Sequence, residues 1–89
     1  MKLSTRFTQL DEFYIAVNAL IKWLKRDGHL EDSQKLDTLM RTAWTTSSEL
    51  LGEMALVLQS MKGNYSQELR KEINECFKFA LHHRKILGL

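Results

Sequence analysis

Hydrophobic residues in the first third of the chain recur at intervals of three and four residues. They are Leu10, Phe13, Tyr14, Val17, Leu20, Ile21 and Leu24. This spacing places them on one face of an α-helix. Acidic residues at 11 and 12 and basic residues at 25 and 26 suit the two ends of a helix dipole. Gly28 follows as a left-handed stop, so the pattern predicts a helix over 8–27.

The middle of the chain carries a longer pattern. Apolar or small residues alternate steps of four and three at Leu36, Met40, Ala43, Ser47, Leu50, Met54, Val57 and Met61. This seam predicts one helix over 31–62. Within the Thr/Ser run at 45–48, however, Thr46 and Glu49 have the spacing of a capping box, which would start a new helix. Because the heptad phase passes through that run unchanged, we favour a continuous helix. A kink near 45–48, giving a four-helix version, is the alternative.

The last third of the chain predicts a helix over 65–87, preceded by a second glycine stop at Gly63. Its hydrophobic face comprises Leu69, Ile73, Cys76, Phe77, Ala80 and Leu87. We therefore expect residues 1–89 to form a single all-α domain, a three-helix antiparallel up-down-up bundle with a long middle helix. At about 1.5 Å per residue the helices measure roughly 30, 48 and 34 Å. A second subunit can cover the excess length of the middle helix.

Two further groups of hydrophobic residues lie off these core faces. Ile15, Ala19 and Trp23 form a stripe on the first helix, and Phe79 and Ile86 lie seven residues apart on the last. Contiguous exposed apolar patches usually mark interfaces. We therefore predict that Ile15, Trp23, Phe79 and Ile86 bind a partner, either a second copy of the chain or another protein.

Composition narrows the class of protein. The hydrophobic share of 44% and the charged share of 27% are ordinary for a globular protein. The longest uncharged stretch, residues 13–21, is far shorter than the ~20 residues that span a bilayer. No apolar run ending in a small-residue cleavage site follows the first methionine. The single cysteine, Cys76, cannot form an internal disulfide and fits a reducing compartment. We expect a cytoplasmic protein that does not bind membranes.

Candidate chemistry is sparse. Glu72, Cys76 and His83 on the last predicted helix are fewer than the four converging ligands of a structural zinc site, so we predict no metal and no cofactor. Cys76 lies on an apolar face, which disfavours the reactive thiolate, and the sequence contains no glycine-flanked serine. We predict no catalytic residue and no enzymatic activity.

Binding to nucleic acid through the basic residues of the last helix is the second interpretation of the sequence. The net charge is only +2, and glutamates at 68, 72 and 75 alternate with the basic residues of the last helix. The candidates for phosphate contacts are Arg70, Lys71, Lys78, Arg84 and Lys85. The sequence thus predicts a small helical protein-interaction module (an adaptor, inhibitor or regulator) that acts through apolar helix surfaces as a homodimer. The alternative is a nucleic-acid-associated regulator that uses the basic flank and C-terminal tip of the last helix.

Overall fold

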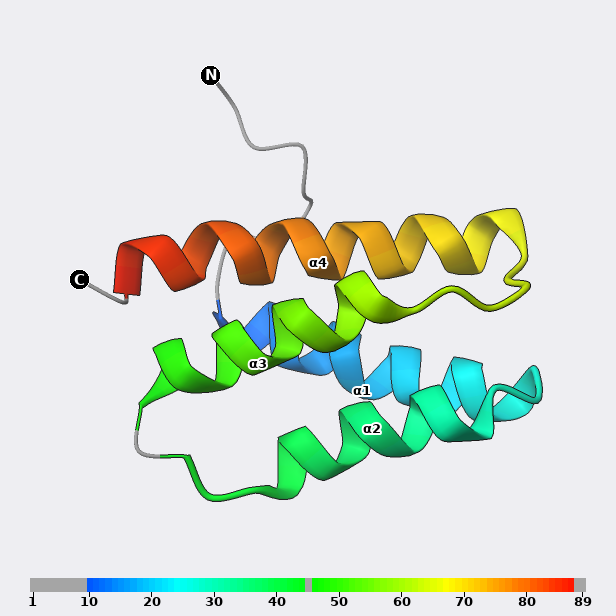
Figure 1. The fold of residues 1–89 in the computed structure, drawn as a ribbon, viewed down its shortest axis with the longest axis horizontal. Helices are drawn as coiled ribbons and strands as arrows, with labels where there is room; N and C mark the ends of the chain where they lie inside the picture. The colour runs from blue at the N-terminus through cyan, green and yellow to red at the C-terminus, as the bar shows by residue number, and fades with distance from the viewer. Residues whose placement is uncertain (1–9, 45, 88–89) are drawn as a thin grey trace.

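The computed structural model describes residues 10–44 and 46–87, with side chains described as far as His83. This part of the chain contains four α-helices and no strand, which confirms the all-helical prediction. The helices are α1 (Leu10–Arg26), α2 (Leu30–Arg41), α3 (Ser47–Ser60) and α4 (Gln67–Leu87). Consecutive helices run in opposite directions in Figure 1. Helix α1 packs against α2 and α4, and α3 packs against the same two helices.

The structure confirms the C-terminal end and the buried face of the first predicted helix. Four residues of α1 are fully buried: Phe13, Val17, Leu20 and Leu24. Gly28 has a positive φ of 89°, the left-handed conformation that glycine adopts without steric cost. The amide of Gly28 donates to the carbonyl of Lys25 at 3.2 Å, and that of His29 donates to the carbonyl of Leu24 at 2.8 Å. This pair of hydrogen bonds is the Schellman motif, which ends α1.

The prediction of one continuous middle helix is wrong, because the described middle segment forms two separate helices. Helix α2 ends at Arg41 and α3 begins at Ser47. The Thr46 hydroxyl accepts from the Glu49 amide at 3.2 Å, and the Glu49 carboxylate accepts from the Thr46 amide at 3.3 Å. This capping box satisfies backbone donors that a new helix start leaves without partners. The Trp44 indole donates to the carbonyl of Leu39 at 2.8 Å and secures the loop after α2.

The break removes the excess length that suggested a partner for the middle helix. Because α3 turns back beside α2, its leucines reach the same core as α1 and α4 (Figure 1). The heptad seam is accordingly buried only in parts: Leu36, Leu50 and Met54 are buried, whereas Ala43 and Ser47 at the break are exposed. Burial in the folded chain therefore replaces the burial that a second subunit would have supplied.

The prediction that Gly63 ends a helix in the left-handed conformation is also wrong. Helix α3 ends in an extended residue, Met61, and Gly28 is the glycine with positive φ among the described residues. A Cβ atom at Gly63 would lie 2.9 Å from the Tyr65 ring. Gly63 thus provides space for Tyr65, which is buried in the core.

Candidate functional site

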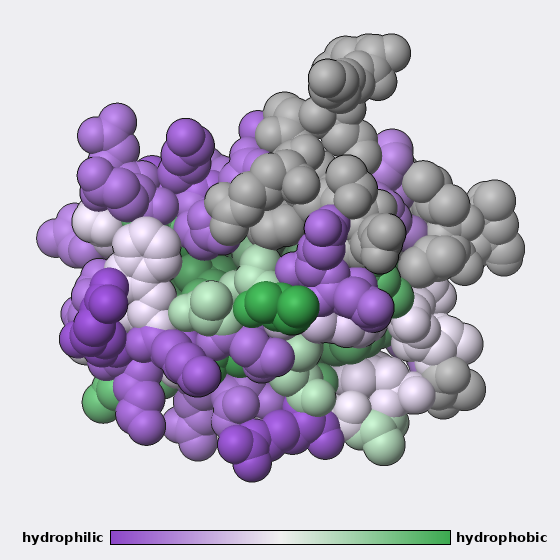
Figure 2. All heavy atoms as spheres, turned by 180° about the vertical axis from the view of Figure 1, so that it is seen from behind, coloured by the Kyte–Doolittle hydropathy of each residue, from purple (hydrophilic) through white to green (hydrophobic). Residues whose placement is uncertain are grey.

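The outward face of α1 carries the most exposed of the large hydrophobic side chains described. Ile15 is 70% exposed, Ala19 is exposed and Trp23 is half-buried. Spacings of four residues place these three side chains along one side of the helix. Figure 2, seen from behind relative to Figure 1, shows hydrophobic residues near the middle of the molecule, with hydrophilic residues beside and below them. The structure thus leaves the predicted stripe on α1 accessible.

Charged residues divide this face of α1 into an acidic and a basic end. The first turn contains Asp11 and Glu12, and the last turn contains Lys25 and Arg26. Residues 12, 15, 19, 22 and 26 are separated by steps of three and four, so they share the outward face, and all five are exposed. The apolar centre at Ile15 and Ala19 therefore lies between opposite charges.

Trp23 is positioned at the basic end. The Arg26 guanidinium lies 5.9 Å from the centroid of the indole ring, within the range of a cation–π contact. Arg26 is also 3.6 Å from the Asp27 carboxylate, but both groups are accessible to solvent and such pairs contribute little. The indole thus presents an apolar surface next to a cation, a combination that is common at protein interfaces.

The prediction that Phe79 faces outward is wrong. Phe79 is fully buried, and its ring stacks on Phe13 with centroids 4.6 Å apart and on His83 with centroids 3.8 Å apart. Helix α4 packs against both α3 and α1, so it buries a wider face than contact with one helix requires. Phe77, which the sequence places on the core face, is only partly buried. The side chain of Ile86 lies outside the described residues.

The predicted phosphate-binding residues do not come together as one described cluster. Arg70, Lys71 and Lys78 are exposed on α4, and the side chains of Arg84 and Lys85 lie outside the described residues. Arg70 lines a groove beside the α3–α4 loop. Lys71 and Lys78, seven residues apart, share a different side of the helix.

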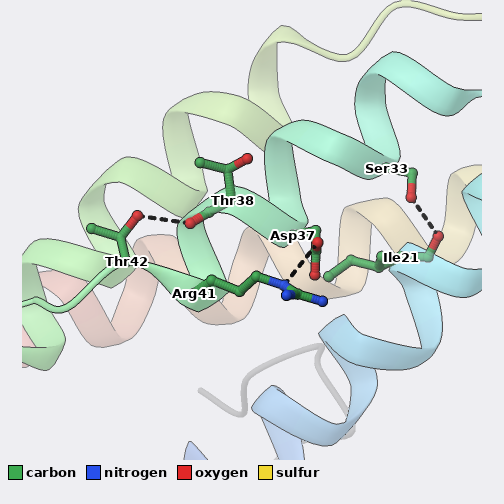
Figure 3. Close-up of polar contacts among 6 residues, drawn as sticks. All are labelled: Ile21, Ser33, Asp37, Thr38, Arg41 and Thr42. Carbon is green, nitrogen blue, oxygen red and sulfur yellow. Dashed lines mark hydrogen bonds and ion pairs between the residues drawn. The ribbon is translucent and has the colours of Figure 1, made fainter.

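A groove between α1 and α2 was not foreseen from the sequence. It has a volume of about 560 Å³ and is lined by Ile21, Lys22, Lys25, Leu30, Ser33, Gln34, Asp37 and Arg41. In Figure 3, Arg41 pairs with Asp37 at 3.0 Å, and the Ser33 hydroxyl donates to the carbonyl of Ile21 at 2.9 Å. The signal in the sequence was Leu30, an apolar residue outside the heptad seam, which is 59% exposed.

A polar cluster joins the α1–α2 turn to the α3–α4 loop. The Tyr65 hydroxyl donates to the Asp32 carboxylate at 2.5 Å, and the Tyr65 ring lies 4.7 Å from that of His29. Burial, together with this hydrogen bond, raises the pKa of Tyr65 above its ordinary value of 10.0. A buried tyrosine that is bonded to a carboxylate on another element anchors the two connections, so we assign this cluster a structural role.

Replacing Tyr65 with phenylalanine should lower the free energy of unfolding at pH 7 by about 1.5 kcal/mol, because the charge-assisted hydrogen bond is lost. The raised folded pKa favours the neutral phenol. Its contribution is therefore complete below pH 10 and is lost as the pH rises through the folded pKa of Tyr65. Urea denaturation of both chains between pH 7 and 11 measures this, and the gap between them should narrow above pH 10. An equal alkaline loss in both chains would contradict the assignment.

Three observations concern metal ligands, the thiol and buried polar groups among the described residues. Among them, no three histidine, cysteine, aspartate or glutamate side chains converge as a metal site requires. Cys76 is fully buried. Every buried side-chain nitrogen or oxygen in this part of the chain has a hydrogen-bond partner. Within residues 10–44 and 46–87, no helix combines the length and apolar character needed to cross a membrane.

Comparison of the chain with models of protein families, with curated proteins and with solved structures gave no significant match. The candidate site therefore rests on the outward face of α1 and on its chemistry.

Proposed function

We propose that this chain is a small helical bundle that acts as a protein-interaction module, an adaptor, inhibitor or regulator, through the outward face of α1. The observation that carries the proposal is the 70% exposure of Ile15, with Ala19 and Trp23 in line on the same helix. An aligned apolar patch with a charged border is typical of interaction sites. Leaving it in water forgoes the favourable free energy of burying apolar area.

The scaffold under this face is suited to binding. The opposite side of α1 is held by fully buried residues, including Phe13, Leu20 and Leu24. A helix fixed in this way loses little conformational freedom when a partner docks. Tryptophan and arginine, here Trp23 and Arg26, are the residue types most often found at energetic centres of interfaces.

The polar groups of the described residues also favour binding over chemistry as the role of this chain. Tyr65 and Asp32 hold two connections together, and Ser33 ties α2 to α1. Each of these contacts has a structural purpose, and Ile15 on the outward face of α1 is the most exposed of the large hydrophobic residues described.

Site-specific photo-crosslinking in the source cell tests the proposal. A photoreactive amino acid is placed at Ile15 in one variant and at Leu56 in a matched control. Leu56 is a similar exposed aliphatic residue, 55% exposed, but it lies on α3. We expect a discrete protein adduct from position 15 that is absent or at least tenfold weaker from position 56.

The adduct is analysed by mass spectrometry, whether it contains the chain itself or a different protein. Equal labelling at both positions, or no adduct from position 15, would overturn the assignment of the α1 face as the contact surface.

A further inference from the structure

We propose that the partner of the α1 face is a second copy of this chain, with the two α1 helices paired antiparallel about a two-fold axis at Ala19. This inference rests on the proposed function of the α1 face. A two-fold interface uses the same patch on both subunits, so that patch must be complementary to itself. The outward face of α1 meets this condition in the order of its apolar and charged residues.

The register follows from the positions of the residues. When Ala19 faces Ala19 of the second copy, antiparallel pairing sets Ile15 opposite Trp23 of that copy. The small side chain at the centre lets the two helix backbones approach closely. The exposed Ile15 and the half-buried Trp23 then cover one another twice, once on each side of the axis. Burial of these two pairs supplies the apolar part of the binding free energy.

The charges of α1 select the antiparallel orientation. In this register Glu12 lies opposite Arg26 of the second copy, and Lys22 of that copy lies nearer the axis on the same side. Asp11 lies opposite Asp27, whose carboxylate is itself paired with Arg26. A parallel arrangement would place acid on acid and base on base. Exposed ion pairs each contribute only about 0.2–1 kcal/mol, so we assign them to orientation and the apolar pairs to affinity.

Leu30, which is also exposed, fits a second copy less well. Leu30 lies in the α1–α2 groove among Lys22, Lys25 and Arg41, and the one carboxylate there, Asp37, is paired with Arg41. Two copies of that groove would bring cations together. Like charges facing each other in an interface oppose association. The α1 face, by contrast, presents both signs in a symmetric order.

Two charge-reversed chains test the pairing. In one, Asp11→Lys and Glu12→Lys make both ends of the face basic; in the other, Lys22→Glu and Arg26→Glu make both ends acidic. Sedimentation equilibrium in low salt should show wild-type chain with twice the mass of a single chain at high concentration. Each reversed chain alone should sediment as a monomer, because like charges then meet at both ends. An equimolar mixture of the two should form a heterodimer.

A third comparison avoids charge changes at the ends of α1, because reversed charges there interact unfavourably with the helix dipole and can destabilise the helix itself. Ile15→Asp changes an exposed residue in the middle of the helix, and Leu56→Asp is its control on α3. Ile15→Asp should raise the dimer dissociation constant at least tenfold, whereas Leu56→Asp should leave it within twofold. Circular dichroism confirms that each chain is helical.

The outcomes separate this inference from the function on which it rests. A wild-type chain that stays monomeric, reversed chains that still dimerise, or a folded mixture that stays monomeric would each overturn the pairing. If position 15 nevertheless crosslinks to a different protein in the cell, the proposed function stands and only the identity of the partner is wrong. If position 15 crosslinks to nothing, both proposals fall.

Discussion

Replacing Phe79 with alanine should lower the free energy of unfolding by about 3–5 kcal/mol, the usual cost of removing a fully buried aromatic ring. The Phe79 ring is inaccessible to solvent and stacks between Phe13 and His83, so its loss leaves a cavity bounded by two helices. Urea denaturation followed by circular dichroism at 222 nm measures the change. Phe79→Leu, which keeps most of the buried volume, should cost less and keeps the comparison measurable if Phe79→Ala does not fold.

Phe77 is the matched control for this prediction. It is the same residue type on the same helix, but it is only partly buried against the core. Phe77→Ala should therefore cost less than Phe79→Ala, since less apolar area returns to water. The pattern of hydrophobic residues alone implies the reverse order. A larger loss for Phe77→Ala would mean that α4 is rotated relative to the arrangement described above.

Replacing Leu36 with alanine should cost about 2–5 kcal/mol, within the range for a fully buried leucine. Ser33 and Leu36 are the buried residues of α2, and Leu39 and Met40 pack against the core only as partly buried residues. Hydrogen exchange should show that the amides of α2 lose protection before those of α1 and α4. A helix attached through so few buried contacts opens at a lower free energy than the rest of the molecule.

Leu30→Ala is the control for this second prediction, because it makes the same substitution in the same helix. Leu30 is 59% exposed, so its loss should change the free energy of unfolding by no more than about 0.5 kcal/mol. Equal effects of the two substitutions would show that α2 is held by contacts other than Leu36.

Local features of the sequence predicted the helices and several of their ends. The buried face of α1 was predicted from intervals of three and four residues, and its C-terminus from Gly28. The capping box at Thr46 and Glu49 was visible as well, but the regular heptad seam pointed to a continuous helix. The capping box predicts a helix start at Thr46, whereas the heptad seam predicts a helix that continues through it. Local sequence patterns do not show which of these two structures has the lower free energy.

Tertiary packing favours two separate helices over one continuous helix. A helix over 31–62 would leave half of its seam without a neighbour, whereas a break lets Leu50, Met54 and Leu58 join the same core as Leu36. The free energy of burying this second half exceeds the loss of a few helical hydrogen bonds, some of which the capping box replaces. The candidate site was affected in turn, because the surplus length that suggested a partner for the middle helix no longer exists.

The stripe of Ile15, Ala19 and Trp23 could be predicted from the sequence alone, because the buried face of a helix defines which side faces outward. The position of Phe79 depended on the tertiary structure. Helix α4 contacts α1 as well as α3, and a helix with two neighbours buries residues that a single hydrophobic stripe does not include. The sequence by itself determined where helices form and which side of α1 faces the core. Only the packing of four helices determined where the chain turns back and which aromatic residue of α4 lies inside, because both depend on contacts between segments far apart along the chain.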